Sequence, residues 1–198
     1  MADVKLDDTI KDKLKDSFKV SENDIIEVVS FFNKTLKPVL KSHYLSHLVA
    51  SIEEIINSNK KKEFLKRIKN TNKTGDKKNS THVFLNEENA RIFSIVLVPI
   101  PNSKRKALSL NKRGGVIIYY ADYLGENERR FVIAHELGHI VNDYILNNQN
   151  DNIENRASLF AYIALLDKNN FYKNEAPEYI TSNDVTLFRD LETILHIS

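Results

Sequence analysis

The run His135-Glu136-Leu137-Gly138-His139 constrains the fold more than any other feature of this sequence. Apolar residues recur around it at three- and four-residue spacing, which predicts a helix over about residues 126–146. On a helix, residues four apart lie on one face, so both histidine side chains can converge on a single point. An apolar stripe on another face of this helix would pack against the core. Its members are Ile133, Leu137, Ile140, Val141 and Tyr144.

The spacing of two histidines, with a glutamate directly after the first, is the H-E-x-x-H pattern of zinc peptidases. The two imidazoles would bind zinc, at one ion per chain, and zinc would polarise a peptide carbonyl and lower the pKa of a bound water to about 7. Glu136 lies on the neighbouring strip of the same face, where it could take a proton from that water. We therefore predict that His135 and His139 bind zinc and that Glu136 is the catalytic base.

Gly138 lies inside the predicted helix, where a glycine costs about 1 kcal/mol relative to alanine. We expect another element to pack too closely at this position for a side chain. The alternative to a metal site is a helix whose two histidines merely pair with carboxylates. His43 and His47 have the same spacing but lack the glutamate, and we interpret them as an ordinary helix surface.

A catalytic zinc site needs a third protein ligand, with the fourth position left for water. After His139 the sequence has no histidine until His196. Asp143, one helical turn beyond His139, is expected to be unable to bend back onto the same metal, although it could act outside the ligand shell. Glu154 begins an apolar helix predicted over about residues 153–166, where an unpaired buried carboxylate would be costly, so zinc is its expected partner. The alternative is a first-turn glutamate favoured by the helix dipole.

The pattern of apolar and polar residues divides the chain into three segments, which we interpret as two regions joined by a linker. Residues 1–69 predict helices of unknown role, residues 70–80 form a basic polar linker or loop, and residues 81–198 form the metallopeptidase domain. Within the last segment β-branched and aromatic residues predict several strands, two of them joined by a tight turn containing Gly114 and Gly115. The predicted strands span 83–85, 92–100, 107–110 and 116–120. The predicted helices span 126–146, 153–166 and 183–196.

Composition excludes several classes of protein. The chain has no cysteine, so disulfides, cysteine zinc sites and thiol nucleophiles are excluded. Its N-terminus is acidic and polar, and its longest apolar stretch is about half the roughly 20 residues of a membrane helix. We therefore expect a cytoplasmic protein without a membrane partner. Residues 60–78 hold nine basic and two acidic residues, a run that could bind nucleic acid but is more commonly a solvated helix end.

Residues 106–195 resemble the ImmA/IrrE family of H-E-x-x-H metallopeptidases. The similarity is carried by Gly115–Tyr120, by Glu128–Ala134 with the H-E-L-G-H run that follows, and by Glu154–Ala161 with a double leucine after it. The family pattern in the last helix is close to E-x-x-A-N-x-F-A-x-x-L-L. Its glutamate is the third zinc ligand of the family, which implies that role for Glu154. Ser158 stands where the family usually has asparagine.

The resemblance implies an α+β, zincin-like metallopeptidase domain, with a small and mostly antiparallel sheet beside the active-site helices. An N-terminal helical region would precede it. The resemblance also implies cleavage of one partner protein, typically a helix-turn-helix transcriptional repressor, in a phage, mobile-element or stress-response system. In zincin-like enzymes a sheet edge holds the substrate in extended form. Val116–Tyr120 is a candidate for that edge, with an interior strand as the alternative.

The sequence leaves two questions open, the group that stabilises the oxyanion and the possibility of a function other than proteolysis. A tetrahedral intermediate normally needs a further donor. The candidates are Tyr119, Tyr120, Tyr123, Tyr144, Tyr162, Arg156 and His196. One alternative function is a metal-bound module that binds a repressor or toxin without cutting it, although the intact Glu136 argues against this. Another is a nucleic-acid-binding protein that uses residues 60–78.

Overall fold

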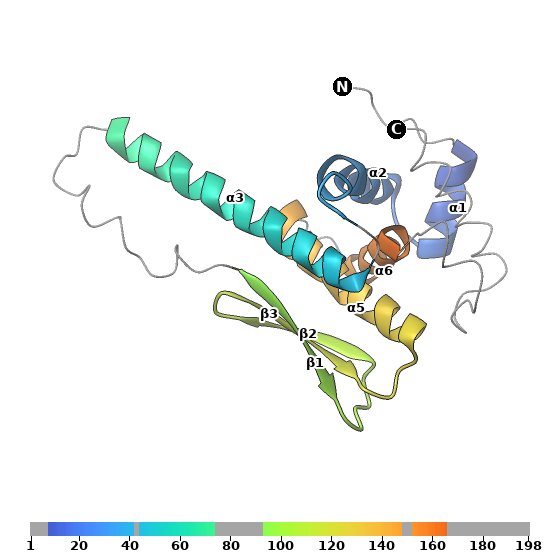
Figure 1. Cartoon of the computed structure of the whole chain (residues 1–198). Helices are drawn as coiled ribbons and strands as arrows, with labels where there is room; N and C mark the ends of the chain where they lie inside the picture. The colour runs from blue at the N-terminus through green and yellow to red at the C-terminus, as the bar shows by residue number, and fades with distance from the viewer. Residues whose placement is uncertain (1–7, 42–43, 74–92, 148–151, 166–198) are drawn as a thin grey trace.

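The computed structural model describes residues 8–41, 44–73, 93–147 and 152–165, which together form an α+β fold (Figure 1). Helices α3 (Leu45–Lys73) and α5 (Glu126–Val141) lie between a three-stranded sheet and the other helices. Those other helices are α1 (Asp8–Phe18), α2 (Glu22–Phe31) and α6 (Ile153–Leu165). The predicted α+β class is confirmed. No helix in the described ranges is long and apolar enough to cross a membrane.

Helix α2 begins with Ser21 as its N-cap. Ser21 Oγ accepts a hydrogen bond from the backbone N–H of Asp24 at 3.2 Å, and Asp24 Oδ2 accepts one from the N–H of Ser21 at 3.0 Å. This reciprocal pair is a capping box, which satisfies two backbone donors at the start of the helix. The helix runs directly into a short π-helical turn, η1 (Phe32–Leu36).

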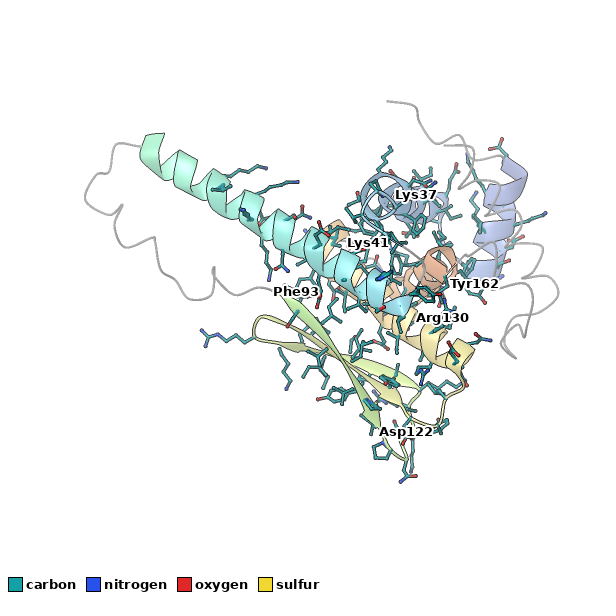
Figure 2. The ribbon with its side chains drawn as sticks, viewed as in Figure 1. Lys37, Lys41, Phe93, Asp122, Arg130 and Tyr162 are labelled. Carbon is teal, nitrogen blue, oxygen red and sulfur yellow. The ribbon has the colours of Figure 1, made fainter. Side chains whose placement is uncertain are left out.

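Helix α3 continues to Lys73, past the predicted start of the linker at residue 70. Its Asn57 side chain pairs with the backbone at the start of the sheet, donating to the carbonyl of Phe93 at 3.0 Å and accepting from its N–H at 2.7 Å. Figure 2 shows Phe93 beside this helix. The predicted division at residues 69, 70–80 and 81 remains a prediction.

The sheet is mixed, which corrects the expectation of a mostly antiparallel one. Its strands are β1 (Ser94–Ile100), β2 (Ala107–Lys112) and β3 (Gly115–Ala121), in the order β1-β3-β2. Gly114, with φ of 88°, closes the tight turn that makes β2 and β3 antiparallel. Since β1 pairs with the far side of β3 and runs opposite to β2, it is parallel to β3.

The central position of β3 also corrects a functional expectation. Residues Val116–Tyr120 pair with β1 on one side and with β2 on the other. They are therefore an interior strand, and their backbone is not free to hold an extended substrate. Among the described strands, β2 is an outer strand, and it contacts helix α5.

The predicted helices after the sheet are confirmed at 126–146 and 153–166, with small differences at their ends. The first consists of α5 and a π-helical turn, η3 (Asn142–Leu146), and the second is α6. In the predicted apolar stripe of α5, Ile133, Leu137, Ile140 and Val141 are buried, while Tyr144 is half-buried. The predicted strand at 83–85, the helix at 183–196 and His43 lie outside the described residues.

One hydrophobic core connects the N-terminal helices to the helices that follow the sheet. Helix α6 is the centre of this core, and its residues 159–165 are all buried. Tyr162 of α6 packs edge-on against Phe18 of α1, with ring centroids 4.8 Å apart, and against Phe131 of α5 at 5.1 Å. Figure 2 shows Tyr162 among these helices. The N-terminal helices therefore help to fix the position of α6.

Candidate metal centre

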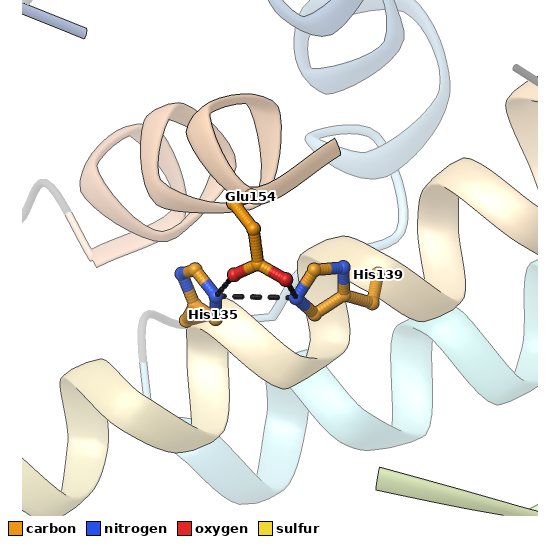
Figure 3. Close-up of side chains that lie close together, drawn as sticks. All are labelled: His135, His139 and Glu154. Atoms are coloured by element: carbon orange, nitrogen blue, oxygen red, sulfur yellow. Dashed lines mark hydrogen bonds and ion pairs between the residues drawn. The ribbon is translucent and has the colours of Figure 1, made fainter. Parts of the chain in front are cut away.

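Helices α5 and α6 bring together the three side chains that the sequence predicted as metal ligands (Figure 3). The Nε2 atoms of His135 and His139 are 3.1 Å apart. Glu154 lies across from them, with Oε2 3.2 Å from Nε2 of His135 and Oε1 3.6 Å from Nε2 of His139. All the potential ligand atoms lie within 4.8 Å of one another. Two imidazole nitrogens and a carboxylate oxygen at this spacing could hold a metal ion.

The contact that positions Glu154 is made by Gly138. A β-carbon at Gly138 would lie 2.7 Å from the Cα of Ala157 and 2.9 Å from its carbonyl oxygen. The expected close approach is therefore confirmed, and the neighbour is the backbone of α6. Ala157 lies almost one helical turn after Glu154, so this contact brings the first turn of α6 over the two histidines.

Burial differs among the three side chains, and one expectation is corrected by it. Glu154 has 80% of its side-chain surface exposed, against 20% for His135 and 18% for His139. The argument that Glu154 needs a metal because it is buried is therefore wrong. Glu154 occupies the first turn of α6, where the helix dipole favours a carboxylate and water can still reach it. Its proximity to both imidazoles now supports the ligand role instead.

The surroundings of His135 favour a neutral ring. Burial lowers its pKa below the ordinary value, and the nearby His139 lowers it further, while Glu154 opposes both effects. A neutral imidazole has a free nitrogen lone pair, which is the form that binds metals. The other ring nitrogen, Nδ1, lies 3.2 Å from Oγ of Ser158.

A cleft of about 510 Å³ lies beside the cluster, between α5, the start of α6 and strand β2. Glu136, the predicted base, lines this cleft together with His139 and Glu154. Asp143 lines it as well but does not belong to the three-residue cluster, which agrees with the expectation that it cannot join the same metal. The cleft thus places the predicted base and two of the predicted ligands on one accessible surface.

The oxyanion-donor candidates that the structure describes do not line this cleft. None of the described tyrosine candidates lines it, and His196 lies outside the described residues. Arg156 is 1% exposed and forms ion pairs with Asp24 and, at 2.8 Å, with Glu27. The guanidinium is therefore committed to the interior, and Arg156 as an oxyanion donor was a wrong candidate.

Sequence reasoning missed the wall that strand β2 and the segment before it contribute to the cleft. Arg105, Ser109 and Asn111 line the cleft together with Glu136. Asn111 accepts a hydrogen bond at 3.2 Å from the hydroxyl of Tyr144, which connects this wall to η3. No spacing pattern in the sequence indicates that these residues line the cleft, since their position depends on the pairing of β2 with β3. Ser158 was noted only as a departure from the family pattern, although its place four residues after Glu154 on the same predicted helix could have indicated a position near the cluster.

Comparison with known protein families gives a match. The family model of the IrrE N-terminal-like domain, a peptidase family, matches residues 81–192. That range contains the three clustered side chains, the cleft and the whole described sheet. No curated protein and no solved structure matches the chain.

Proposed function

The chain belongs to the IrrE N-terminal-like peptidase family, and on this premise we propose that it is a site-specific zinc endopeptidase with a zincin-like catalytic domain. One observation carries the proposal. His135, His139 and Glu154 converge within 4.8 Å from two helices, and Glu136 faces the adjoining cleft. The alternative of two histidines that only pair with a carboxylate would use the same two contacts with Glu154, and the zinc content of the purified protein distinguishes it from a metal site.

The donor set fits zinc. Two histidines and one glutamate are a known ligand set of catalytic zinc sites, which keep a further position open. Bound zinc would supply a Lewis acid for the scissile carbonyl and lower the pKa of a water molecule to about 7. Two of the proposed ligands, His139 and Glu154, line the cleft, where a substrate has room to enter.

Glu136 is the proposed general base. It follows His135 directly on α5 and lines the cleft beside His139. From this position its carboxylate would accept a proton from the attacking water and then donate it to the leaving amine. Arg105 has the single guanidinium among the described residues that line the cleft, and we propose it as the candidate donor to the developing oxyanion.

We propose that an extended segment of substrate lies along β2. Residues 107–109 and 111 of this strand line the cleft, and β2 is an outer strand of the described sheet. An extended peptide can add to such a strand by main-chain hydrogen bonds, while side-chain pockets select its sequence. This assigns to β2 the role first expected for β3.

The proposed substrate is a helix-turn-helix transcriptional repressor, in a phage, mobile-element or stress-response system. The resemblance to ImmA/IrrE peptidases supports this choice. The experiment is to incubate the purified chain and zinc with a helix-turn-helix protein encoded by a neighbouring gene, and to identify fragments by mass spectrometry. A single zinc-dependent cut, absent with Glu136→Gln, is expected. Intact repressor at full zinc occupancy would instead favour the non-cutting binding module.

A further inference from the structure

Ser158 lies on α6, the helix that carries Glu154, and its side chain contacts both His135 and the backbone of that helix. Its Oγ lies 3.2 Å from Nδ1 of His135 and 3.1 Å from the carbonyl oxygen of Glu154. The residue is half-buried, and Glu154 precedes it by one helical turn. A single hydroxyl therefore meets an imidazole and a backbone acceptor at the same time.

Counting protons limits the hydrogen bonds of this hydroxyl to two arrangements. A serine hydroxyl has one proton to donate and lone pairs that accept. If that proton goes to the carbonyl of Glu154, the nitrogen at 3.2 Å must carry its own proton and donate it to Oγ. His135 is then protonated at Nδ1, and the lone pair of its Nε2, 3.2 Å from Oε2 of Glu154, is available to a metal ion held between the two residues. In the other arrangement the hydroxyl donates to Nδ1, and Nε2 carries the proton and donates it to Glu154.

We propose that Ser158 is a positioning residue for the metal centre, which fixes the ring orientation and the tautomer of His135 by accepting the Nδ1 proton. The inference rests on the proposed zinc site. Metal-binding histidines commonly donate their second N–H to a nearby acceptor, and loss of that acceptor weakens metal binding by about 10- to 100-fold. Ser158 is the acceptor that the structure supplies.

The alternative is a purely local role, in which the Ser158 hydroxyl only caps a backbone carbonyl of its own helix and has no effect on metal binding. Serines inside helices often donate to the carbonyl four residues earlier, without any functional partner. That bond alone would leave the binding of metal unaffected when the hydroxyl is removed. The 3.2 Å contact between His135 Nδ1 and the same oxygen separates a positioning role from a purely local one. If Ser158 positions the ring, removing its hydroxyl also changes how Nε2 on the other side of the ring binds metal.

The experiment measures zinc affinity by competition with a chelator in the wild type, Ser158→Ala and Ser158→Thr. We expect affinity to fall about tenfold in Ser158→Ala and to return in Ser158→Thr, which keeps the hydroxyl. The control is Ser58→Ala, which removes an exposed hydroxyl of α3 and should leave affinity unchanged. Thermal unfolding of the metal-free variants separates weaker metal binding from damage to the fold.

A second measurement needs no variant of Ser158. In the metal-free protein, nitrogen-15 chemical shifts show which ring nitrogen of His135 carries the proton, with assignment by loss of the signal in His135→Ala. Protonation at Nδ1 supports the inference, and protonation at Nε2 overturns it. Equal zinc affinity in Ser158→Ala and the wild type would overturn the inference alone. Absence of zinc binding in the wild type would overturn the proposed metal site with it.

Discussion

Gly138 and Ala157 are so close that a β-carbon on the glycine would lie 2.7 Å from the Cα of the alanine. Because the obstacle is the backbone of α6, no side chain can rotate away to make room. The distance between α5 and α6 at this point also sets how closely Glu154 approaches the two histidines. A change at Gly138 should therefore affect both stability and metal binding.

Gly138→Val should lower the free energy of unfolding by about 1–3 kcal/mol, the usual cost of forcing extra atoms into a packed interface. It should also weaken zinc binding, since α6 has to move outward with Glu154. The measurements are urea unfolding of the metal-free protein and zinc affinity. Gly125→Ala is the control, because a β-carbon there meets no atom within 4 Å. Unchanged zinc affinity in Gly138→Val would show that this contact does not set the site.

The purified protein should contain about one zinc ion per chain, and His139→Ala should lose most of it. Removing one of three protein ligands leaves too few donors for a stable zinc site. Metal content after dialysis, measured by mass spectrometry, tests this. His47→Ala is the matched control, since His47 lies on α3 outside the cluster. Full occupancy in His139→Ala would contradict the ligand assignment.

Glu136→Gln and Glu154→Gln should fail in different ways. Glu136→Gln keeps the shape of the base but cannot take a proton, so zinc should remain while cleavage falls by about 10²- to 10⁴-fold. Glu154→Gln replaces an anionic ligand with a weak neutral one, so zinc should be lost first and activity with it. Excess zinc should partly restore the second variant only. Zinc content and cleavage rate on the same samples decide, and the opposite pattern would reverse the two roles.

Asp24 should make stability depend on pH in acid. Although burial raises its pKa, the hydrogen bonds from Ser21 and the ion pair with Arg156 outweigh burial and lower it. Stabilisation from a carboxylate with a lowered pKa is complete above the unfolded value of about 3.9 and is lost as the pH falls through the folded value. The free energy of unfolding should therefore decrease below about pH 4 in the wild type.

Asp24→Asn should remove that part of the pH dependence and cost about 3 kcal/mol at pH 7, because it leaves a buried guanidinium with fewer partners. Unfolding in urea over a series of pH values, with a chelator present, gives both quantities. Asp16→Asn changes an exposed aspartate of α1 and should alter stability by less than about 0.5 kcal/mol. An unchanged acid profile in Asp24→Asn would show that another group controls it.

Local chemistry made much of the site predictable. The spacing of His135 and His139 is a property of one helix, and the cost of Gly138 signals a close neighbour whatever that neighbour is. In each case the residues that decide the structure lie within one or two helical turns of each other.

Features that depend on distant pairing could not be predicted in this way. The parallel pairing of β1 with β3 follows from strand order, which no local pattern records. Arg156 was considered for the active site because nothing nearby shows that its partner lies 132 residues earlier, at Asp24. The exposure of Glu154 was misjudged for a related reason, since an apolar helix can still begin at the rim of a cleft.

The ion pairs of Arg156 limit how the chain can be divided. This arginine lies two residues after Glu154, and both of its carboxylate partners belong to α2. A fragment that starts at residue 81, where the family match begins, would therefore leave a buried cation without either counter-charge and strip one side of α6. Any fusion or truncation of this chain that keeps α6 should therefore keep α2 as well. The unit that folds begins before residue 81, where the similarity to the family begins.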